Sequence, residues 1–147
     1  MMITGENIKQ AIIQKLLEIE PAITVYKEAS TSPIFPHFFV YQINVTDELE
    51  RAKYHLLNYS FDIRYRRASD SSTDLKLQKN LDDMGLKLLQ NFNIINFRNS
   101  KIKCLNKSIE KEDGVLHFFC NFTVLCREID EESAEKFGKI KVEVKTE

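Results

Sequence analysis

The chain has 147 residues, of which 43% are hydrophobic and 29% charged, and this composition is typical of one globular domain with a substantial core. A formal net charge of −1 gives no overall electrostatic reason to bind nucleic acid or an anionic membrane. No apolar stretch approaches the roughly 18 residues that a transmembrane helix needs, and the sequence opens without a signal-peptide pattern. We therefore expect a cytoplasmic protein whose cysteines, Cys104, Cys120 and Cys126, are reduced thiols.

Hydrophobic periodicity predicts a helix followed by strands in the first part of the chain. Apolar residues recur at helical spacing over residues 5–20, with Thr4 as a candidate N-cap and Pro21 ending the helix. Residues 23–28 and 37–45 have the composition of strands. The proline-bearing stretch between these two segments predicts a loop.

The middle of the chain predicts a third strand and a second helix. The charged stretch 46–53 shows no clear pattern. Residues 54–67 alternate between apolar and polar side chains, which is typical of an antiparallel strand with one buried face. Residues 73–90 carry an apolar stripe at helical spacing, and Thr73 is a candidate cap for this helix.

The dipeptide Asp113-Gly114 introduces the most informative stretch of the sequence. Asp-Gly between strand-like segments is a strong hairpin signal, and here it joins a strand near 101–110 to a long strand at 115–127. At about 3.3 Å per residue, the second strand would be roughly 40 Å long. Its even-numbered residues are apolar and should face the helices. Its mixed odd-numbered face suits either a subunit contact or a cover formed by the chain's own loop or tail.

These elements predict an α+β fold, in which a largely antiparallel sheet of about five strands has two helices packed on one face. We expect one domain over residues 1–127. Beyond it, residues 128–147 form a tail that is first acidic and then β-prone. This tail should be either mobile or an extra strand that orders only against a partner.

The sequence contains no combination of residues that predicts catalysis. It has neither a Gly-rich phosphate loop nor histidine pairs at metal-ligand spacing. His37, His55 and His117 each stand alone in or beside strand-like sequence, which favours a hydrogen-bonded structural role. We therefore predict that the protein is not an enzyme and has no catalytic residue, cofactor or metal site.

The segment Arg64-Tyr65-Arg66-Arg67 is the one locally basic cluster. It could contact phosphates while Tyr65 stacks on a base, or it could be a solvated strand end paired with carboxylates, which the net charge favours. A third interpretation places the arginines against an acidic surface of another subunit, such as residues 128–135. The candidate subunit-interface residues are Arg64, Arg66, Phe119 and Leu125.

Several short stretches spread over residues 2–127 match one known family in order and wording. They are Met2–Ile12, Val25–Glu28, Pro36–Ile43, Asn58–Tyr65 and Asp113–Phe119. Together they resemble the tail terminator (tail completion) proteins of phages and phage-derived contractile particles in Gram-positive bacteria. These stretches are structural signatures and not catalytic ones, and the acidic tail lies outside them.

The resemblance implies a structural virion protein that forms a ring, usually of six copies, on the head-proximal end of the tail tube. Such a ring halts tube polymerisation and either offers a docking surface to the neck or simply caps a headless particle. The implied partners are other copies of the chain and the tube, sheath and neck proteins, with neither membrane nor sequence-specific nucleic acid. The implied location is the tail end of a virion or phage-like particle that is assembled in the host cytoplasm. The alternatives are a neck or head-completion protein and a small nucleic-acid-binding domain that uses Arg64 to Arg67.

Overall fold

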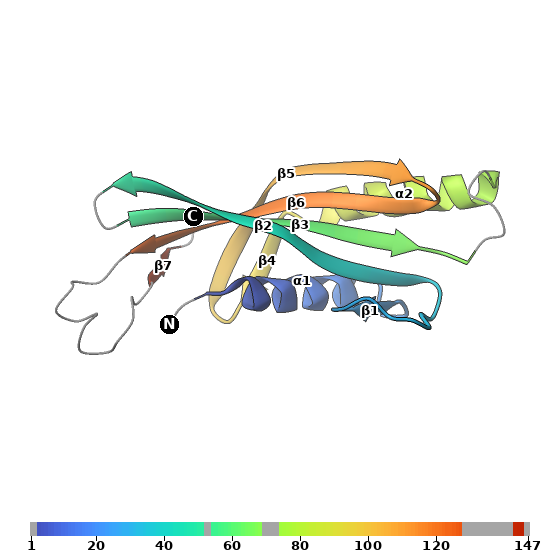
Figure 1. Cartoon of the computed structure of the whole chain (residues 1–147), viewed down its shortest axis with the longest axis horizontal. Coiled ribbons are helices and arrows are strands. Elements are labelled where there is room, and N and C mark those ends of the chain that lie inside the picture. The colour runs from blue at the N-terminus through green and yellow to red at the C-terminus, as the bar shows by residue number, and fades with distance from the viewer. Residues whose placement is uncertain (1–2, 52–53, 69–73, 128–142, 146–147) are drawn as a thin grey trace.

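The computed structural model describes residues 3–51, 54–68, 74–127 and 143–145 of the chain. Two helices and a curled, mixed sheet make up this α+β fold (Figure 1). The elements are α1 (Gly5–Ile19), β1 (Thr24–Tyr26), β2 (His37–Arg51), β3 (Tyr54–Arg66), α2 (Leu75–Asn91), β4 (Ile94–Phe97), β5 (Ser100–Glu112), β6 (Val115–Arg127) and β7 (Glu143–Lys145). Neither helix in the described part has the length and apolar character needed to cross a membrane.

Six strands lie in the order β1-β2-β3-β6-β5-β4, and β7 pairs with β6 outside this path. All neighbours are antiparallel except β1, which runs parallel to β2. The predicted count of about five antiparallel strands is therefore too low. The sequence did not reveal β4 because four residues are too few to establish an alternating pattern. The residues of β7 fall in the tail that was expected to be either mobile or a strand ordered only against a partner, and β7 pairs with β6 of its own chain.

Both helices begin at a polar cap. Thr4 and Asn7 form a reciprocal capping box at α1, as the predicted N-cap requires. At α2 the cap is Asp74, whose side chain accepts a hydrogen bond from the backbone N–H of Lys76. The predicted cap, Thr73, lies outside the described residues.

Strand β2 continues well past its predicted end at residue 45. Residues 46–51 pair with β3, although their sequence shows no apolar alternation. The reason is that the side chains of Thr46, Asp47 and Glu48 are all exposed, so neither face of this part of the strand needs apolar residues.

The predicted hairpin at Asp113-Gly114 is confirmed. Both residues have positive φ, 51° and 76°, as a two-residue hairpin loop of the primed type requires. The turn sets β5 and β6 in antiparallel register, with Glu112 opposite Val115. The predicted strand at 115–127 is also present in full.

The core lies on the even-numbered face of β6. Leu116, Phe118, Cys120, Phe122 and Val124 are all at most 1% exposed. They share this face with alternate residues of β3, namely Tyr59, Phe61, Ile63 and Tyr65. Cys120 and Cys104 are both buried free thiols.

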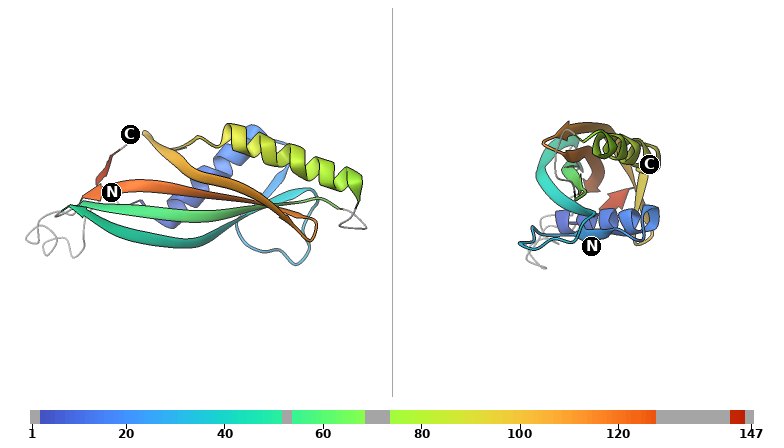
Figure 2. Two further views of the ribbon diagram at one scale, coloured as in Figure 1. Left: turned by 90° about the horizontal axis from the view of Figure 1, so that it is seen from above. Right: turned by 90° about the vertical axis from the view of Figure 1, so that its right-hand side faces the viewer.

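Both helices contact this core, and the sheet curls around it (Figure 2). The Tyr59 hydroxyl donates to the carbonyl of Ile3, just before α1, at 3.1 Å. The Tyr65 hydroxyl donates to the side chain of Asn80 in α2 at 3.0 Å. At the end of α2, the Phe92 ring lies 5.4 Å from that of Phe118. The two tyrosine hydroxyls thus find acceptors at opposite ends of a continuous apolar layer.

Candidate subunit interface

The face of the sheet opposite the core carries a cluster of polar and aromatic side chains. The pairing of β2 with β3 and of β3 with β6 places these residues side by side, because directly opposed residues point to the same face. One row across β2, β3 and β6 contains Phe39, Arg64 and His117. The next row contains Tyr41, Asp62 and Phe119. We call these six residues, together with His37 and Arg66, the open face.

Asp62 is the centre of the open face and is only 3% exposed. Its Oδ2 accepts a hydrogen bond from Nε of Arg64 at 2.9 Å and is 2.9 Å from Nδ1 of His117. A carboxylate removed from water is costly unless it is paired, and these two nitrogens provide the pairing. We infer that Nδ1 of His117 carries its proton toward Asp62. The three side chains therefore form one fixed unit.

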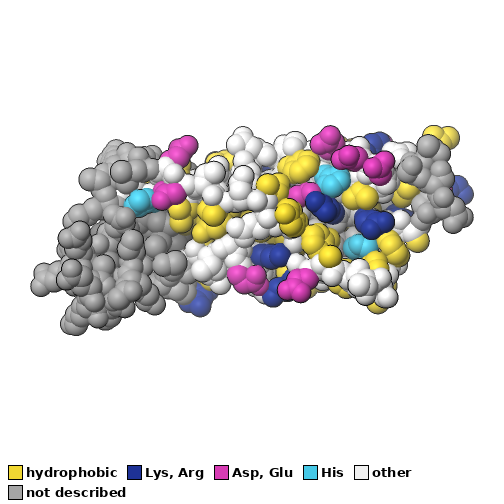
Figure 3. Space-filling view, viewed as in Figure 1, with side chains coloured by type: hydrophobic (Ala, Val, Ile, Leu, Met, Phe, Trp, Pro, Cys, Tyr) yellow, Lys and Arg dark blue, Asp and Glu magenta, His cyan; other side chains and the backbone are white. Residues whose placement is uncertain are grey.

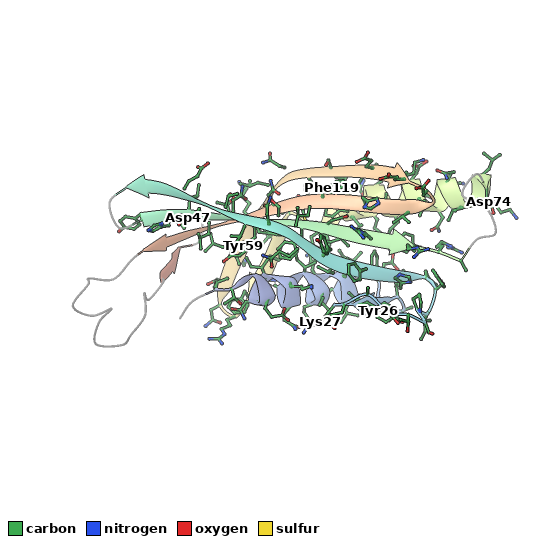
Figure 4. The ribbon with its side chains drawn as sticks, viewed as in Figure 1. Tyr26, Lys27, Asp47, Tyr59, Asp74 and Phe119 are labelled. Atoms are coloured by element: carbon green, nitrogen blue, oxygen red, sulfur yellow. The ribbon has the colours of Figure 1, made fainter. Side chains whose placement is uncertain are left out.

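Aromatic rings flank this unit. The guanidinium carbon of Arg64 lies 5.3 Å from the ring centre of Tyr41 and 6.0 Å from that of Phe39. The His117 ring stacks on Phe119, with centroids 5.9 Å apart and planes 9° from parallel. These contacts hold Arg64 against the sheet, so its position is set within its own chain. Figure 4 labels Phe119 on the central strands.

An open pocket of about 160 Å³ adjoins the open face, where the β1–β2 loop meets β2 and β3. It is lined by Tyr26, Ala29, Ser30, Pro33, His37, Phe39, Arg64 and Arg66. The pocket thus places two guanidinium groups beside aromatic rings and small residues of the β1–β2 loop. Tyr26, labelled in Figure 4, lies at the β1 side of this arrangement.

His37 forms the buried wall of the pocket and is 5% exposed. Its Nδ1 is 3.1 Å from the carbonyl oxygen of Ile34, and its ring lies edge-on to Tyr26. Burial, with a smaller contribution from the positive charge of Arg66, lowers the pKa of His37 below its ordinary value. The pocket therefore contains a neutral imidazole at neutral pH, and its positive charge comes from the two arginines.

Three of the four predicted interface residues lie near one another on this face. Arg64 and Arg66 are on β3, and Phe119 lies opposite Asp62 on β6. Leu125 shares the face but is six residues, or roughly 20 Å, farther along β6. There it lies opposite Leu56 on one side and Lys145 of β7 on the other.

The sequence did not identify the other members of the open face. Asp62 looked like one more polar residue in an alternating strand, and Phe39 and Tyr41 looked like ordinary strand aromatics. Only the pairing of β2, β3 and β6 brings them together, and sequence patterns within single strands do not specify that pairing. The predicted structural role of the histidines is consistent with hydrogen-bond contacts of His37 to the Ile34 carbonyl, His55 to Asp47 and His117 to Asp62.

The charge on this side of the sheet is mixed. On β5, Glu110 lies opposite His117 and Glu112 opposite Val115, so carboxylates border the open face (Figure 3). Within the described ranges, no group of three His, Cys, Asp or Glu side chains could hold a metal ion. The arrangement suits contacts with another macromolecule through aromatic and charged groups.

The fold is that of a small α+β protein, and the open face is a surface whose charged and aromatic side chains are held in place by contacts within the chain. The family model described as "Phage tail terminator protein" matches residues 7–135, so the chain belongs to this family. The match continues past β6 and includes the acidic stretch as far as Glu135. The chain matches none of the curated proteins with which it was compared.

Family membership confirms the resemblance seen in the sequence. The family is one of structural proteins, and the protein is therefore a component of the phage tail whose partners are other tail proteins.

Proposed function

We propose that the protein forms a ring that caps the head-proximal end of the tail tube, stops tube polymerisation and offers a docking surface to the neck. The observation that carries this proposal is the family match over residues 7–135. We propose six copies in the ring, with tube, sheath and neck proteins of a contractile particle as its partners. Assembly would take place in the host cytoplasm.

The open face supports this proposal as a surface through which neighbouring copies meet. Its aromatic side chains remain accessible, and Tyr41 is 46% exposed. The Asp62 unit fixes their positions before any partner arrives, so binding would order few side chains. We assign Arg64, Arg66 and Phe119 to the centre of the contact between copies and Leu125 to its margin.

The nucleic-acid alternative has less support from the same geometry. Arg64 is already paired with the carboxylate of Asp62. A duplex lying across the face would also meet Glu110 and Glu112, whose charges repel phosphates. A neck or head-completion role would use the same kind of contact surface, and it differs in the partner that is bound.

A tube-capping assay tests the proposal. Purified protein is added to polymerising tube protein, and tube lengths and ends are measured by negative-stain microscopy. We expect rings in the protein alone, and shorter tubes that carry a ring at one end. Tubes of unchanged length, together with a strictly monomeric protein in light scattering, would contradict the proposal. Binding to neck proteins without any effect on tubes would favour the neck alternative.

A further inference from the structure

We propose that the pocket beside the open face binds a carboxylate of the acidic run of a neighbouring copy. The acidic run is residues 128–135, which contain Glu128, Asp130, Glu131, Glu132 and Glu135 and no basic residue. The inference rests on the proposed ring, and it names a contact that would join one copy to the next.

The pocket has the chemistry of a carboxylate site. Nε of Arg64 is occupied by Asp62, and this bond holds the guanidinium group at the pocket wall. Arg66 is exposed, and its guanidinium carbon lies 5.7 Å from the ring centre of Phe35. Guanidinium groups pair well with carboxylates, and aromatic rings lie beside both guanidinium groups. The volume of about 160 Å³ suits one acidic side chain better than a nucleotide.

The described residue that precedes the acidic run, Arg127, lies at the opposite end of β6 from the pocket. Arg66 lies opposite Val115, the first residue of β6, whereas the run follows Arg127, the last. Arg127 is twelve positions after Val115, so these two levels of the sheet are about 40 Å apart. Figure 1 shows the end of β6 beside β7 at one end of the molecule and the β1–β2 connection at the other.

The run is tethered at both of its ends, which limits its reach. Arg127 precedes it, and Glu143, which follows it, is paired directly with Arg127. Glu135 is eight residues from each anchor, so its backbone reaches at most about 28 Å even if both limbs are straight. The other four carboxylates are closer to Arg127 and reach about 18 Å or less. The four carboxylates from Glu128 to Glu132 therefore do not reach the pocket of their own copy, and for them the partner pocket must belong to another copy.

This arrangement gives each copy two different complementary ends. Contacts between unlike surfaces repeat from copy to copy, and they close into a ring when the rotation between copies allows it. Glu110 and Glu112 on β5, on the far side of β6 from the pocket, disfavour an extended polyanion such as DNA, whereas a short acidic segment in the pocket avoids them.

A peptide-binding experiment tests the pocket directly. The full-length protein is prepared with its run neutralised (Glu128→Gln, Asp130→Asn, Glu131→Gln, Glu132→Gln and Glu135→Gln), so that no run competes. A fluorescent peptide of residues 128–135 is then titrated by polarisation. We expect saturable binding, weakened at least tenfold by adding Arg66→Glu. The matched control is Arg98→Glu, because Arg98 also lies over a ring, that of Phe97, but is far from the pocket.

Absence of binding, or equal binding after Arg66→Glu, would overturn the proposal. Displacement of the peptide by DNA at equal charge concentration would also overturn it and would favour the nucleic-acid alternative. A peptide in which every acid is replaced by its amide should not bind.

A mixing experiment tests whether the contact is between copies. The Arg66→Glu protein keeps its run, and the neutralised protein keeps its pocket. Each alone should be monomeric, and an equimolar mixture should give dimers, because only one complementary pair of ends remains. A mixture that stays monomeric, or an Arg66→Glu protein that still forms rings, would overturn the proposed contact. Rings that survive Arg66→Glu and still cap tubes would leave the proposed function intact, whereas wild-type protein without rings would contradict the function itself.

Discussion

The two faces of β6 differ in burial and in chemistry. On the even-numbered face, every described side chain from Leu116 to Val124 is buried in an apolar core. On the odd-numbered face, His117 and Phe119 are half-buried beside the Asp62 carboxylate. Adjacent residues of one strand, such as Phe118 and Phe119, therefore have chemically different surroundings. The comparison indicates that folding depends on one face and that the other is available for assembly.

The largest expected effect is on the core face. Phe118→Asp would place a carboxylate against the Phe92 ring, where no partner for a charge is expected. We expect a loss of about 5 kcal/mol or more in the free energy of unfolding, which is comparable to the total stability of a small domain. This loss of stability is measured by circular dichroism and by the soluble yield. A variant that melts within a few degrees of wild type would show that this face is not the core.

The next effect is on the centre of the open face. Asp62→Ala leaves Nε of Arg64 and Nδ1 of His117 without their shared acceptor. We expect a loss of about 2 kcal/mol, measured as a shift in the urea midpoint. Asp62→Asn, which keeps one acceptor oxygen, should lose less. Equal stability of Asp62→Ala and wild type would mean that the unit does not stiffen the face.

A charge beside the Asp62 unit should separate assembly from folding. Phe119→Asp should cost about 1 kcal/mol of stability, because Phe119 is only half-buried, and should weaken assembly at least tenfold. Leu125→Asp should weaken assembly less, because Leu125 lies outside the cluster. Sedimentation over a concentration series compares the two. If Leu125→Asp weakened assembly more than Phe119→Asp, the contact between copies would lie nearer to β7.

The smallest expected effect is a pH dependence at His37. Its pKa is lowered in the folded state, so below the unfolded value of about 6.5 the unfolded chain binds more protons and stability falls as the pH falls. The urea midpoint should therefore decrease from pH 7.5 to pH 5, and by less in His37→Asn, whose amide can still donate to the Ile34 carbonyl. An equal decrease in the urea midpoint of both proteins would show that His37 does not cause the pH dependence.

Much of the fold was predictable because the information is local. The Thr4 cap, the two amphipathic helices and the Asp113-Gly114 turn depend on residues close in sequence. The elements that were missed lacked such a signal. Residues 46–51 extend β2, and the side chains of Thr46, Asp47 and Glu48 in this extension are all exposed. Strand β4 has only four residues.

The candidate site was predicted only in part, for a different reason. Arg64 and Phe119 stood out as single residues, but Asp62, which lies between them, did not. Its burial depends on strands from three separate parts of the chain meeting in one register. Pairing of this kind is a property of the whole sheet, so reading each strand separately did not reveal it.

Light scattering of the wild-type protein and Phe119→Asp at one concentration tests most directly the claim that the open face joins copies into a ring. We predict the mass of a closed ring, six chains, for the wild type. We predict a folded single chain, with an unchanged circular dichroism spectrum, for Phe119→Asp. A wild-type protein with the mass of one chain, or a Phe119→Asp protein that keeps the mass of the ring, would contradict the claim.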